Sequence, residues 1–268
     1  MQSLISELAR LYLLQPQLCF EGPEREQRQS VLPGQLEQHL LGLKTLALDL
    51  VTPAATARTI VLDFCAGGAV RGEQQWRALC VLANALRDQL QLPAPAVSIS
   101  GHGFQLWLSL ASAMPIADIA EFVHLLHAEY LPDDKDKGNG LLVTVVDLPP
   151  ARQPGGKWAA FIHPGMGASF ADEPALDMAP PVGAQVGFLE GLRSIDSARF
   201  AEALATLRRH APPAVTAVTA VARPAASGAI AEVTADALLL KDASLEDIIK
   251  ALHARHIEPS FRFLLPGG

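Results

Sequence analysis

Apolar residues recur at helical spacing in several stretches of the chain. The pattern is clearest over residues 74–90 and 116–130, where polar side chains occupy the opposite face of each predicted helix. Weaker patterns of the same period predict helices over 1–15, 35–41, 187–192 and 198–209. Helical segments therefore occur on both sides of the chain's middle.

Short runs rich in β-branched and large apolar residues lie between these helices and predict strands. They span residues 45–51, 59–64, 96–100, 105–110, 141–146 and 158–163. We expect the first two to be adjacent strands, because only a short Pro/Ala/Thr turn separates them. We expect the third and fourth to form a hairpin-like pair around Gly101 and Gly103.

Composition narrows the class of protein. Half of the 268 residues are apolar, which predicts a packed core, but no apolar run reaches the ~20 residues that span a membrane. The N-terminal helix carries Glu7 and Arg10 within its apolar pattern, so we do not interpret it as a signal peptide. These features predict a cytoplasmic protein with no membrane partner.

The charge and the cysteines exclude other classes. A net charge of −7 argues against a protein that binds DNA strongly on its own, although a local basic cleft or a protein partner could provide the contacts to the phosphate backbone. The chain has three cysteines and no CxxC pair, which argues against a disulfide framework and against a structural zinc site. We therefore interpret the cysteines as buried free thiols.

Two predicted strands end in a carboxylate. Asp63 closes the run TIVLD at 59–63, and Asp147 closes LLVTVVD at 141–147. Carboxylates on neighbouring strands hold the hard cations of nucleotidyl transfer, so the pair could form a split metal site. Two unrelated strand-end aspartates, which sheets often have, are the alternative.

The turn SISGHG at 98–103 is a candidate phosphate cradle, since serine- and glycine-rich turns bring backbone N–H groups near a ligand. Hairpins need such residues in any case. The candidate ligand-binding residues of this turn are Ser98, Ser100, Gly101 and Gly103. Farther along, Lys157 could bind a triphosphate, and His163 could face a sugar or phosphate or serve a structural role.

In this order, the segments resemble the catalytic domain of archaeo-eukaryotic primases (primase-polymerases), and in particular the primase domain of TOTE conflict systems and related mobile-element primases. The matching segments are LDFC at 62–65, SISGHGFQLW at 98–107, VVD at 145–147 and WAAFIHPG at 158–165. The resemblance implies an α+β fold with an RRM-like core, the helices 74–90 and 116–130 on one face of the sheet, and accessory N- and C-terminal helices. It also implies that Asp63 and Asp147 are catalytic metal ligands and that Gln105 occupies a nucleotide-contacting position.

The sequence departs from the family pattern at charged positions. The second acid of the first motif is replaced by Cys65, and a thiol is a poor ligand for Mg²⁺. Gln105 replaces the histidine that contacts the nucleotide in the family, and His102 lies three residues earlier, at a position that does not match. Between the two serines, Ile99 replaces the basic residue of the family. Electrostatic groups at phosphoryl-transfer sites each contribute several kcal/mol, so the resemblance implies the fold more strongly than the reaction.

Three hypotheses follow. The favoured one is a degenerate primase-like protein that binds nucleic acid or nucleotides within a replication, mobile-element or defence complex, with a protein partner such as a helicase and little or no polymerase activity. The alternative is an active primase-polymerase that uses Mg²⁺ or Mn²⁺ on Asp63 and Asp147, with Lys157 or Arg152 neutralising charge on a DNA-templated substrate. The third is an α/β protein with no primase ancestry.

We expect four segments in the chain. They are an N-terminal helix and loop over 1–34, a primase-like core over 35–210, an Ala/Pro/Val-rich linker over 211–233 and a small helix-strand appendage over 234–268.

Overall fold

The computed structural model describes residues 1–21, 28–32, 34–65, 69–132 and 141–210. All of them belong to one unit, Met1–Val215. The second unit, Thr216–Gly268, lies outside the described residues, as do the predicted linker and appendage.

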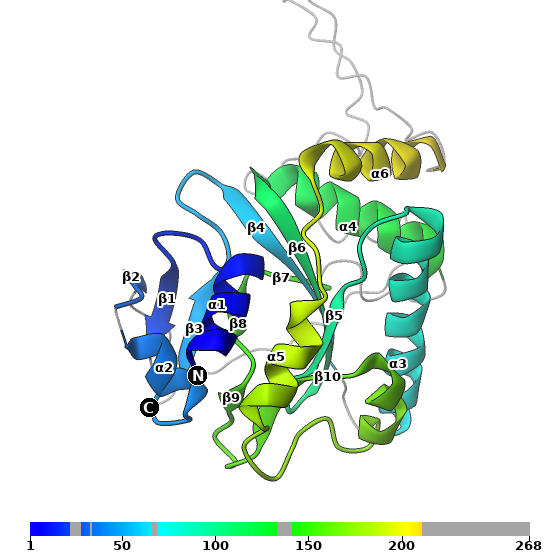
Figure 1. The fold of residues 1–268 in the computed structure, drawn as a ribbon. Coiled ribbons are helices and arrows are strands. Elements are labelled where there is room, and N and C mark those ends of the chain that lie inside the picture. Colours follow the sequence, from blue (N-terminus) through cyan, green and yellow to red (C-terminus); the bar gives the residue numbers. More distant parts are fainter. Residues whose placement is uncertain (22–27, 33, 66–68, 133–140, 211–268) are drawn as a thin grey trace, which may run out of the picture. The chain divides into compact units, whose positions relative to one another are not determined.

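A six-stranded antiparallel sheet forms the centre of the described unit (Figure 1). Its strand order is β7-β4-β6-β5-β10-β9. The strands are β4 (Thr56–Cys65), β5 (Ala96–Ile99), β6 (Gly103–Pro115), β7 (Leu142–Val143), β9 (Ala151–Arg152) and β10 (Trp158–Ile162). The predicted hairpin around Gly101 and Gly103 is confirmed as the β5–β6 pair, and β4 pairs along most of β6 on its other side.

Four of these strands and two helices follow one another as β4–α3–β5–β6–α4–β7. Helix α3 spans Ala69–Asn84 and continues into a π-helical turn, Ala85–Gln89, and α4 spans Ile116–Tyr130. Because β6 lies between β4 and β5, and β4 lies between β6 and β7, each helix links two strands that are not neighbours. The helix predicted over 116–130 has these bounds in the structure, whereas the one predicted over 74–90 begins earlier, at Ala69.

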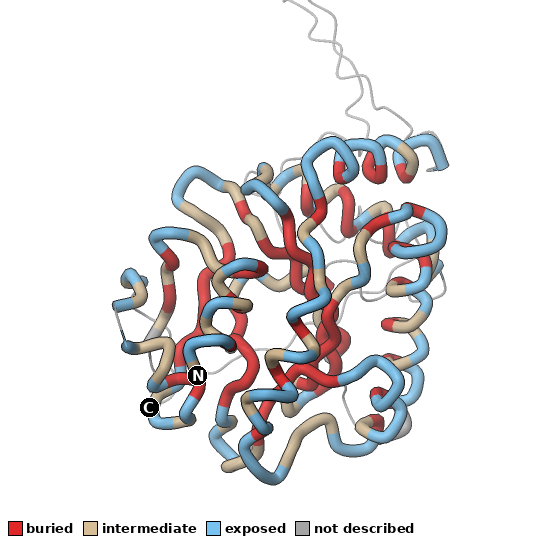
Figure 2. The backbone as a smooth tube through the Cα atoms, viewed as in Figure 1, coloured by how far each residue is buried: buried red, intermediate tan, exposed pale blue. Residues whose placement is uncertain are grey.

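One face of the sheet is covered by helices, as predicted. Residues of α3, α4 and α6 (Ser197–His210) form a single apolar cluster with every second residue of the central strands. On β4 these residues are Ile60, Leu62 and Phe64, because successive strand side chains point to opposite faces. Figure 2 shows the buried positions of these helices on the side that faces the sheet. The α+β class expected from the sequence is therefore confirmed.

The other face of the sheet packs against a second, smaller sheet, which the sequence did not predict. This sheet has the order β2-β1-β3-β8. Its strands are β1 (Leu18–Glu21), β2 (Arg28–Ser30), β3 (Leu46–Asp49) and β8 (Val145–Asp147). Together with α1 (Gln2–Leu11) and α5 (Val182–Glu190), it forms a second apolar cluster that includes Trp107 and Phe161 of the large sheet.

Two strand predictions are wrong for the same reason. The runs 45–51 and 59–64, predicted as adjacent strands, belong to different sheets and are joined only by an isolated bridge between Val51 and Ala57. The run 141–146, predicted as one strand, is divided at Thr144, so that β7 pairs with β4 and β8 pairs with β3. In the first case the chain crosses from one sheet to the other at the turn between the two runs, and in the second case it crosses within a continuous apolar run.

Helix α2 (Gln35–Leu40) holds the small sheet through one buried histidine. The backbone N–H of Leu46 donates to Nδ1 of His39 at 3.0 Å, so Nε2 carries the proton and donates to the carbonyl of Leu148 at 2.7 Å. Burial lowers the pKa of His39 and outweighs the opposing effects of the hydrogen bond to the Leu148 carbonyl and of the Asp147 charge. His39 thus connects the start of β3, at Leu46, to Leu148, the residue that follows β8.

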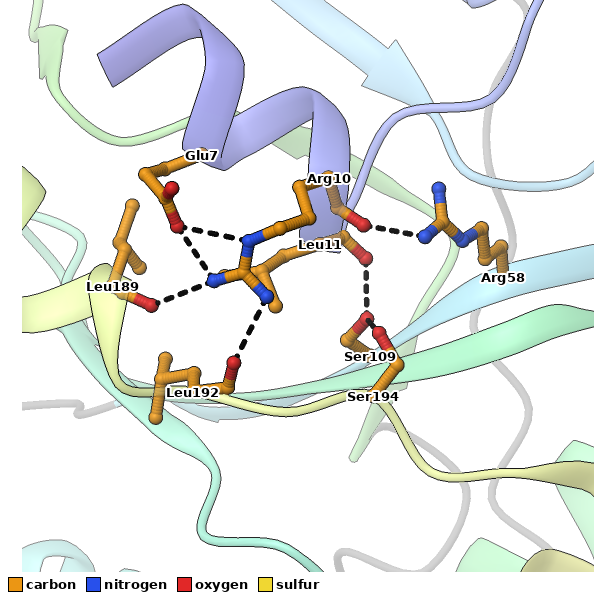
Figure 3. A network of polar contacts seen from close by, with 8 residues as sticks. All are labelled: Glu7, Arg10, Leu11, Arg58, Ser109, Leu189, Leu192 and Ser194. Atoms are coloured by element: carbon orange, nitrogen blue, oxygen red, sulfur yellow. Dashed lines mark hydrogen bonds and ion pairs between the residues drawn. The ribbon is translucent and has the colours of Figure 1, made fainter. Parts of the chain in front are cut away.

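Two arginines tie α1 to the rest of the unit (Figure 3). Arg58 on β4 donates to the carbonyls of Ala9, Arg10 and Leu13 at the end of α1, and also to Leu110 of β6. Arg10 donates to the carbonyls of Leu189 and Leu192 after α5. The helix predicted as part of a separate 1–34 segment therefore packs within the same unit as residues 35–210.

The remaining helices differ from the sequence prediction at their starts. The 3₁₀ turn Pro164–Phe170 was not predicted, and the helix predicted over 187–192 lies earlier in the chain, as α5 over Val182–Glu190. The helix predicted over 198–209 is confirmed as α6. Within the described ranges, no helix has both the length and the apolar character needed to cross a bilayer.

Candidate functional site

The two predicted strand-end carboxylates line the same cavity. It has a volume of about 190 Å³ and lies where β4 and β6 of the large sheet face β8 of the small sheet. Its lining residues are Asp63, Ser100, His102, Gln105, Val143, Val145, Val146, Asp147, Gln153 and Ala159. Four of the predicted site residues, Asp63, Asp147, Ser100 and Gln105, are thus brought together from segments up to 84 positions apart in the sequence (147 − 63).

Asp63 lies on β4 with its side chain toward the small sheet. Its backbone N–H donates to the carbonyl of Leu141 at 2.7 Å, and its Cα is in register with that of Gln105 on β6. Burial raises the pKa of Asp63, and this rise is partly offset by a hydrogen bond from the Gln105 side chain and by the charge of His102. Oδ1 of Asp63 is buried without a hydrogen-bond partner among the described residues.

Asp147 reaches the cavity from the end of β8. Its Cα is in register with Ala47 of β3, so the small sheet determines its position. The next residue, Leu148, is buried, and its carbonyl accepts the hydrogen bond from His39. Asp63 and Asp147 are therefore held by independent sheets, and the packing of the two sheets sets the geometry of the cavity.

The β5–β6 turn forms one wall of the cavity. Ser100 closes the turn, since both its N–H and its hydroxyl donate to the carbonyl of Gly103, at 2.9 and 3.2 Å. Glycine is favoured at position 101 for two reasons. Its φ is +88°, which other residues rarely adopt, and a Cβ there would lie only 3.3 Å from the Gln153 side chain. The N–H of Gly101 already donates to the carbonyl of Pro174 at 2.8 Å. The turn keeps its shape through these internal bonds.

Ser98 lies behind the cavity rather than on its surface. Its side chain is fully buried, and its hydroxyl bonds with Trp107 and Gln105. A direct phosphate contact by Ser98, predicted from the turn, remains a prediction without support from its position. Gly103 begins β6 beside it and is also buried.

The structure does not bring the predicted basic residues into the cavity. Lys157 forms ion pairs with Glu173 and, at 3.6 Å, with Asp177. His163 is exposed at the start of the 3₁₀ turn, where its Nδ1 accepts from the N–H of Gly165 at 3.0 Å. Arg152 is exposed on β9. None of the three is among the described residues that line the cavity.

Two lining residues were missed or set aside at the sequence level. His102 was noted only as standing at a non-matching place, yet it is exposed at the cavity and its charge lowers the pKa of Asp63. Gln153 had no sequence signal, because its approach to Gly101 depends on the turn between β9 and β10. The SGHG segment could have identified His102, since a turn that faces a ligand exposes its tip residue.

The residues present do not fit the two-cation site that nucleotidyl transfer uses. Two hard cations are held by several carboxylate oxygens, usually from three acids. Among the described residues, no group of three or more His, Cys, Asp or Glu side chains is arranged to hold a metal ion.

Comparisons with known proteins give little similarity. No protein-family model matches the chain, and no curated protein matches it. Among solved structures, the chain is similar to the polymerase domain of Mycobacterium tuberculosis Ligase D in complex with DNA, with 11% sequence identity and a TM-score of 0.39 over 71% of this chain and 70% of that chain. At this TM-score the similarity assigns neither a family nor a function.

Proposed function

We propose that this chain is a degenerate archaeo-eukaryotic primase-like protein that binds nucleic acid or nucleotides and has little or no polymerase activity. The observation that carries the proposal is the convergence of Asp63 and Asp147, from two different sheets, on one cavity with Ser100 and Gln105. Two unrelated strand-end aspartates would not be expected to line the same cavity. The matched segments of the primase resemblance thus share one place in the fold.

The connectivity of the large sheet supports the same proposal. The succession β4–α3–β5–β6–α4–β7 with the strand order β7-β4-β6-β5 is the arrangement expected of an RRM-like core. Strands β9 and β10 extend this core at the β5 edge. The small sheet and α1 add a second layer, which carries Asp147 to the cavity.

The loss of catalysis is proposed from the chemistry of the cavity wall. Nucleotidyl transfer depends on charge stabilisation of the phosphates by cations and basic side chains, and each such group contributes several kcal/mol. The described lining offers two carboxylates, one of them with a raised pKa, the neutral side chains of Ser100, Gln105 and Gln153, and a single histidine, His102. Hydrogen bonding and shape, rather than metal chemistry, then determine what the cavity binds.

A partner is part of the proposal. The net charge of −7 gives weak attraction for a phosphate backbone, so tight binding to nucleic acid requires a second protein, such as a helicase, in a replication, mobile-element or defence complex. The chain alone then binds a nucleotide or a single strand at the cavity with modest affinity.

Two assays on the purified full chain test the proposal. We expect no template-dependent nucleotide incorporation with Mg²⁺ or Mn²⁺, and saturable binding of a fluorescent ATP analogue or of labelled single-stranded DNA. Val145→Phe adds bulk to the cavity lining and should abolish this binding. Val81→Phe makes the same change at an exposed position on α3 and should leave binding unchanged.

Other outcomes separate the alternatives. Incorporation that disappears in Asp63→Ala would establish the active primase-polymerase instead. Absence of binding to both probes, or binding by Val145→Phe equal to that of the unsubstituted chain, would refute a ligand-binding role for the cavity.

A further inference from the structure

A row of polar side chains crosses the face of the large sheet behind the cavity. The Cα of Gln105 on β6 is in register with Asp63 on one side and with Ser98 of β5 on the other. Trp107, two residues after Gln105, points to the same face. Ser98 and Trp107 are fully buried, and Gln105 is 5% exposed. Polar groups this deep require partners, because a buried donor or acceptor without one destabilises the fold.

The hydrogen bonds in this row have a single direction. An indole Nε1–H can only donate, and Trp107 donates it to the Ser98 hydroxyl oxygen at 2.9 Å. The single hydroxyl proton of Ser98 is then free to donate to Oε1 of Gln105, at 3.3 Å. The Gln105 carboxamide is therefore oriented with its oxygen toward Ser98 and its NH₂ group away from it.

The indole that sets this direction is itself held in place. The Trp107 ring packs edge-on against Tyr12 of the segment after α1, with 5.3 Å between ring centroids, and against Phe161 of β10, at 5.6 Å. These aromatic contacts belong to the apolar cluster between the two sheets. A rotation of the indole would break them, so its N–H keeps one direction.

We propose that Trp107 and Ser98 are positioning residues that fix the Gln105 amide as a hydrogen-bond donor at the cavity wall. Gln105 lines the cavity, and its side chain hydrogen-bonds Asp63, its cross-strand neighbour on β4, whereas Trp107 and Ser98 are absent from the described lining. The amide has two N–H groups: one donates to Asp63, and in this proposal the other donates to an oxygen of the ligand. The ligand class is thus an oxygen acceptor, a phosphate or a base carbonyl. This inference rests on the proposed function only for the identity of the ligand.

The orientation of the amide is testable without any ligand. In ¹⁵N-labelled full-length protein, the Trp107 indole N–H and the Gln105 side-chain NH₂ should give sharp NMR signals with slow hydrogen exchange. Ser98→Ala should speed exchange of the indole N–H and broaden or shift the Gln105 signals. Ser109→Ala removes another buried hydroxyl from the same face of the sheet, on β6, and it should leave both sets of signals unchanged. Unchanged Gln105 signals in folded Ser98→Ala would overturn the proposal.

Binding of the fluorescent ATP analogue provides the second readout. Ser98→Ala should weaken binding about tenfold, the effect of losing one oriented hydrogen bond, and Ser109→Ala should not. Trp107→Phe keeps the aromatic packing but removes the N–H, and it serves where Ser98→Ala fails to fold. Wild-type affinity in both Ser98→Ala and Trp107→Phe would overturn the positioning role. If the unsubstituted chain binds no probe, the proposed function fails, and the NMR signals alone decide the orientation of the amide.

Discussion

The two faces of the large sheet are built from the same strands but differ in chemistry. The face covered by α3, α4 and α6 is apolar, and Leu62 and Leu106 are among the fully buried residues of its core. The opposite face, toward α1 and the small sheet, alternates large apolar residues with buried polar ones such as Thr59, Gln105 and Ser109. The first face stabilises the fold, and the second one also positions groups at the cavity.

The second face itself divides into two ends. Near α1, each polar side chain has a backbone partner: the hydroxyl of Thr59 donates to the carbonyl of Tyr12, and that of Ser109 donates to Leu11 (Figure 3). At the cavity end, Oδ1 of Asp63 is buried without a partner in the described part of the chain. Buried polar groups are usually satisfied, so an exception marks a place where a ligand group is expected.

The largest expected effect lies on the helix-covered face. Leu62→Ala should lower the free energy of unfolding by about 3 kcal/mol, because Leu62 is fully buried and the surrounding helices cannot close the cavity left behind. Urea denaturation measures the change. Affinity for the ATP analogue, measured where the variant is fully folded, should stay within about twofold. A selective loss of binding would show that the two faces are coupled.

A smaller loss of stability is expected at the α1 end. Arg58→Met keeps much of the side-chain length but removes the donors to Ala9, Arg10 and Leu13. We expect a decrease of about 2 kcal/mol in the free energy of unfolding, in the range for hydrogen bonds to a charged group. Arg87→Met, at an exposed arginine paired with neighbours in sequence, is the control and should leave the free energy of unfolding nearly unchanged. Equal losses would contradict the anchoring of α1 by Arg58.

This contrast explains how much could be predicted from the sequence. The helices on the apolar face and the β5–β6 hairpin were predicted because a long periodic pattern and a glycine turn are local signals. The small sheet was missed because β3 and β8 are short and pair only through the folded chain. A continuous apolar run does not show where a chain passes from one sheet to another.

The candidate site shows the same division. Asp63 and Asp147 could be chosen because each ends an apolar run, and the structure places both at one cavity. Lys157 could not be assigned from the sequence, because its ion pairs with Glu173 and Asp177 depend on how the following segment returns to β10. The polar row was also not predictable, since register across strands decides that Ser98 lies beside Gln105.

At the cavity end, we expect an effect on both binding and stability. Gln105→Leu has a similar shape but removes both amide N–H groups, and it should weaken binding of the ATP analogue about tenfold. It also leaves the buried Ser98 hydroxyl without its acceptor, so the free energy of unfolding should fall by about 1 kcal/mol. Gln91→Leu, at an exposed glutamine after the π-helical turn, should change neither property. Isothermal titration and urea denaturation together distinguish the two effects.

The smallest expected effect concerns the sign of the pH dependence at Asp63. Burial raises the pKa of this carboxyl in the folded state, so the folded protein binds its proton more tightly than the unfolded chain. The stability that comes from protonated Asp63 is fully present below the unfolded pKa, near 4, and is lost as the pH rises through the folded value. Asp63→Asn should therefore stabilise the protein at pH 7, because it removes an ionised carboxylate that burial disfavours, and this gain should vanish in acid. A gain in Asp63→Asn that persists unchanged below pH 4 would mean that the carboxylate is not disfavoured at this end of the sheet, and that the contrast between the two ends lies in shape alone.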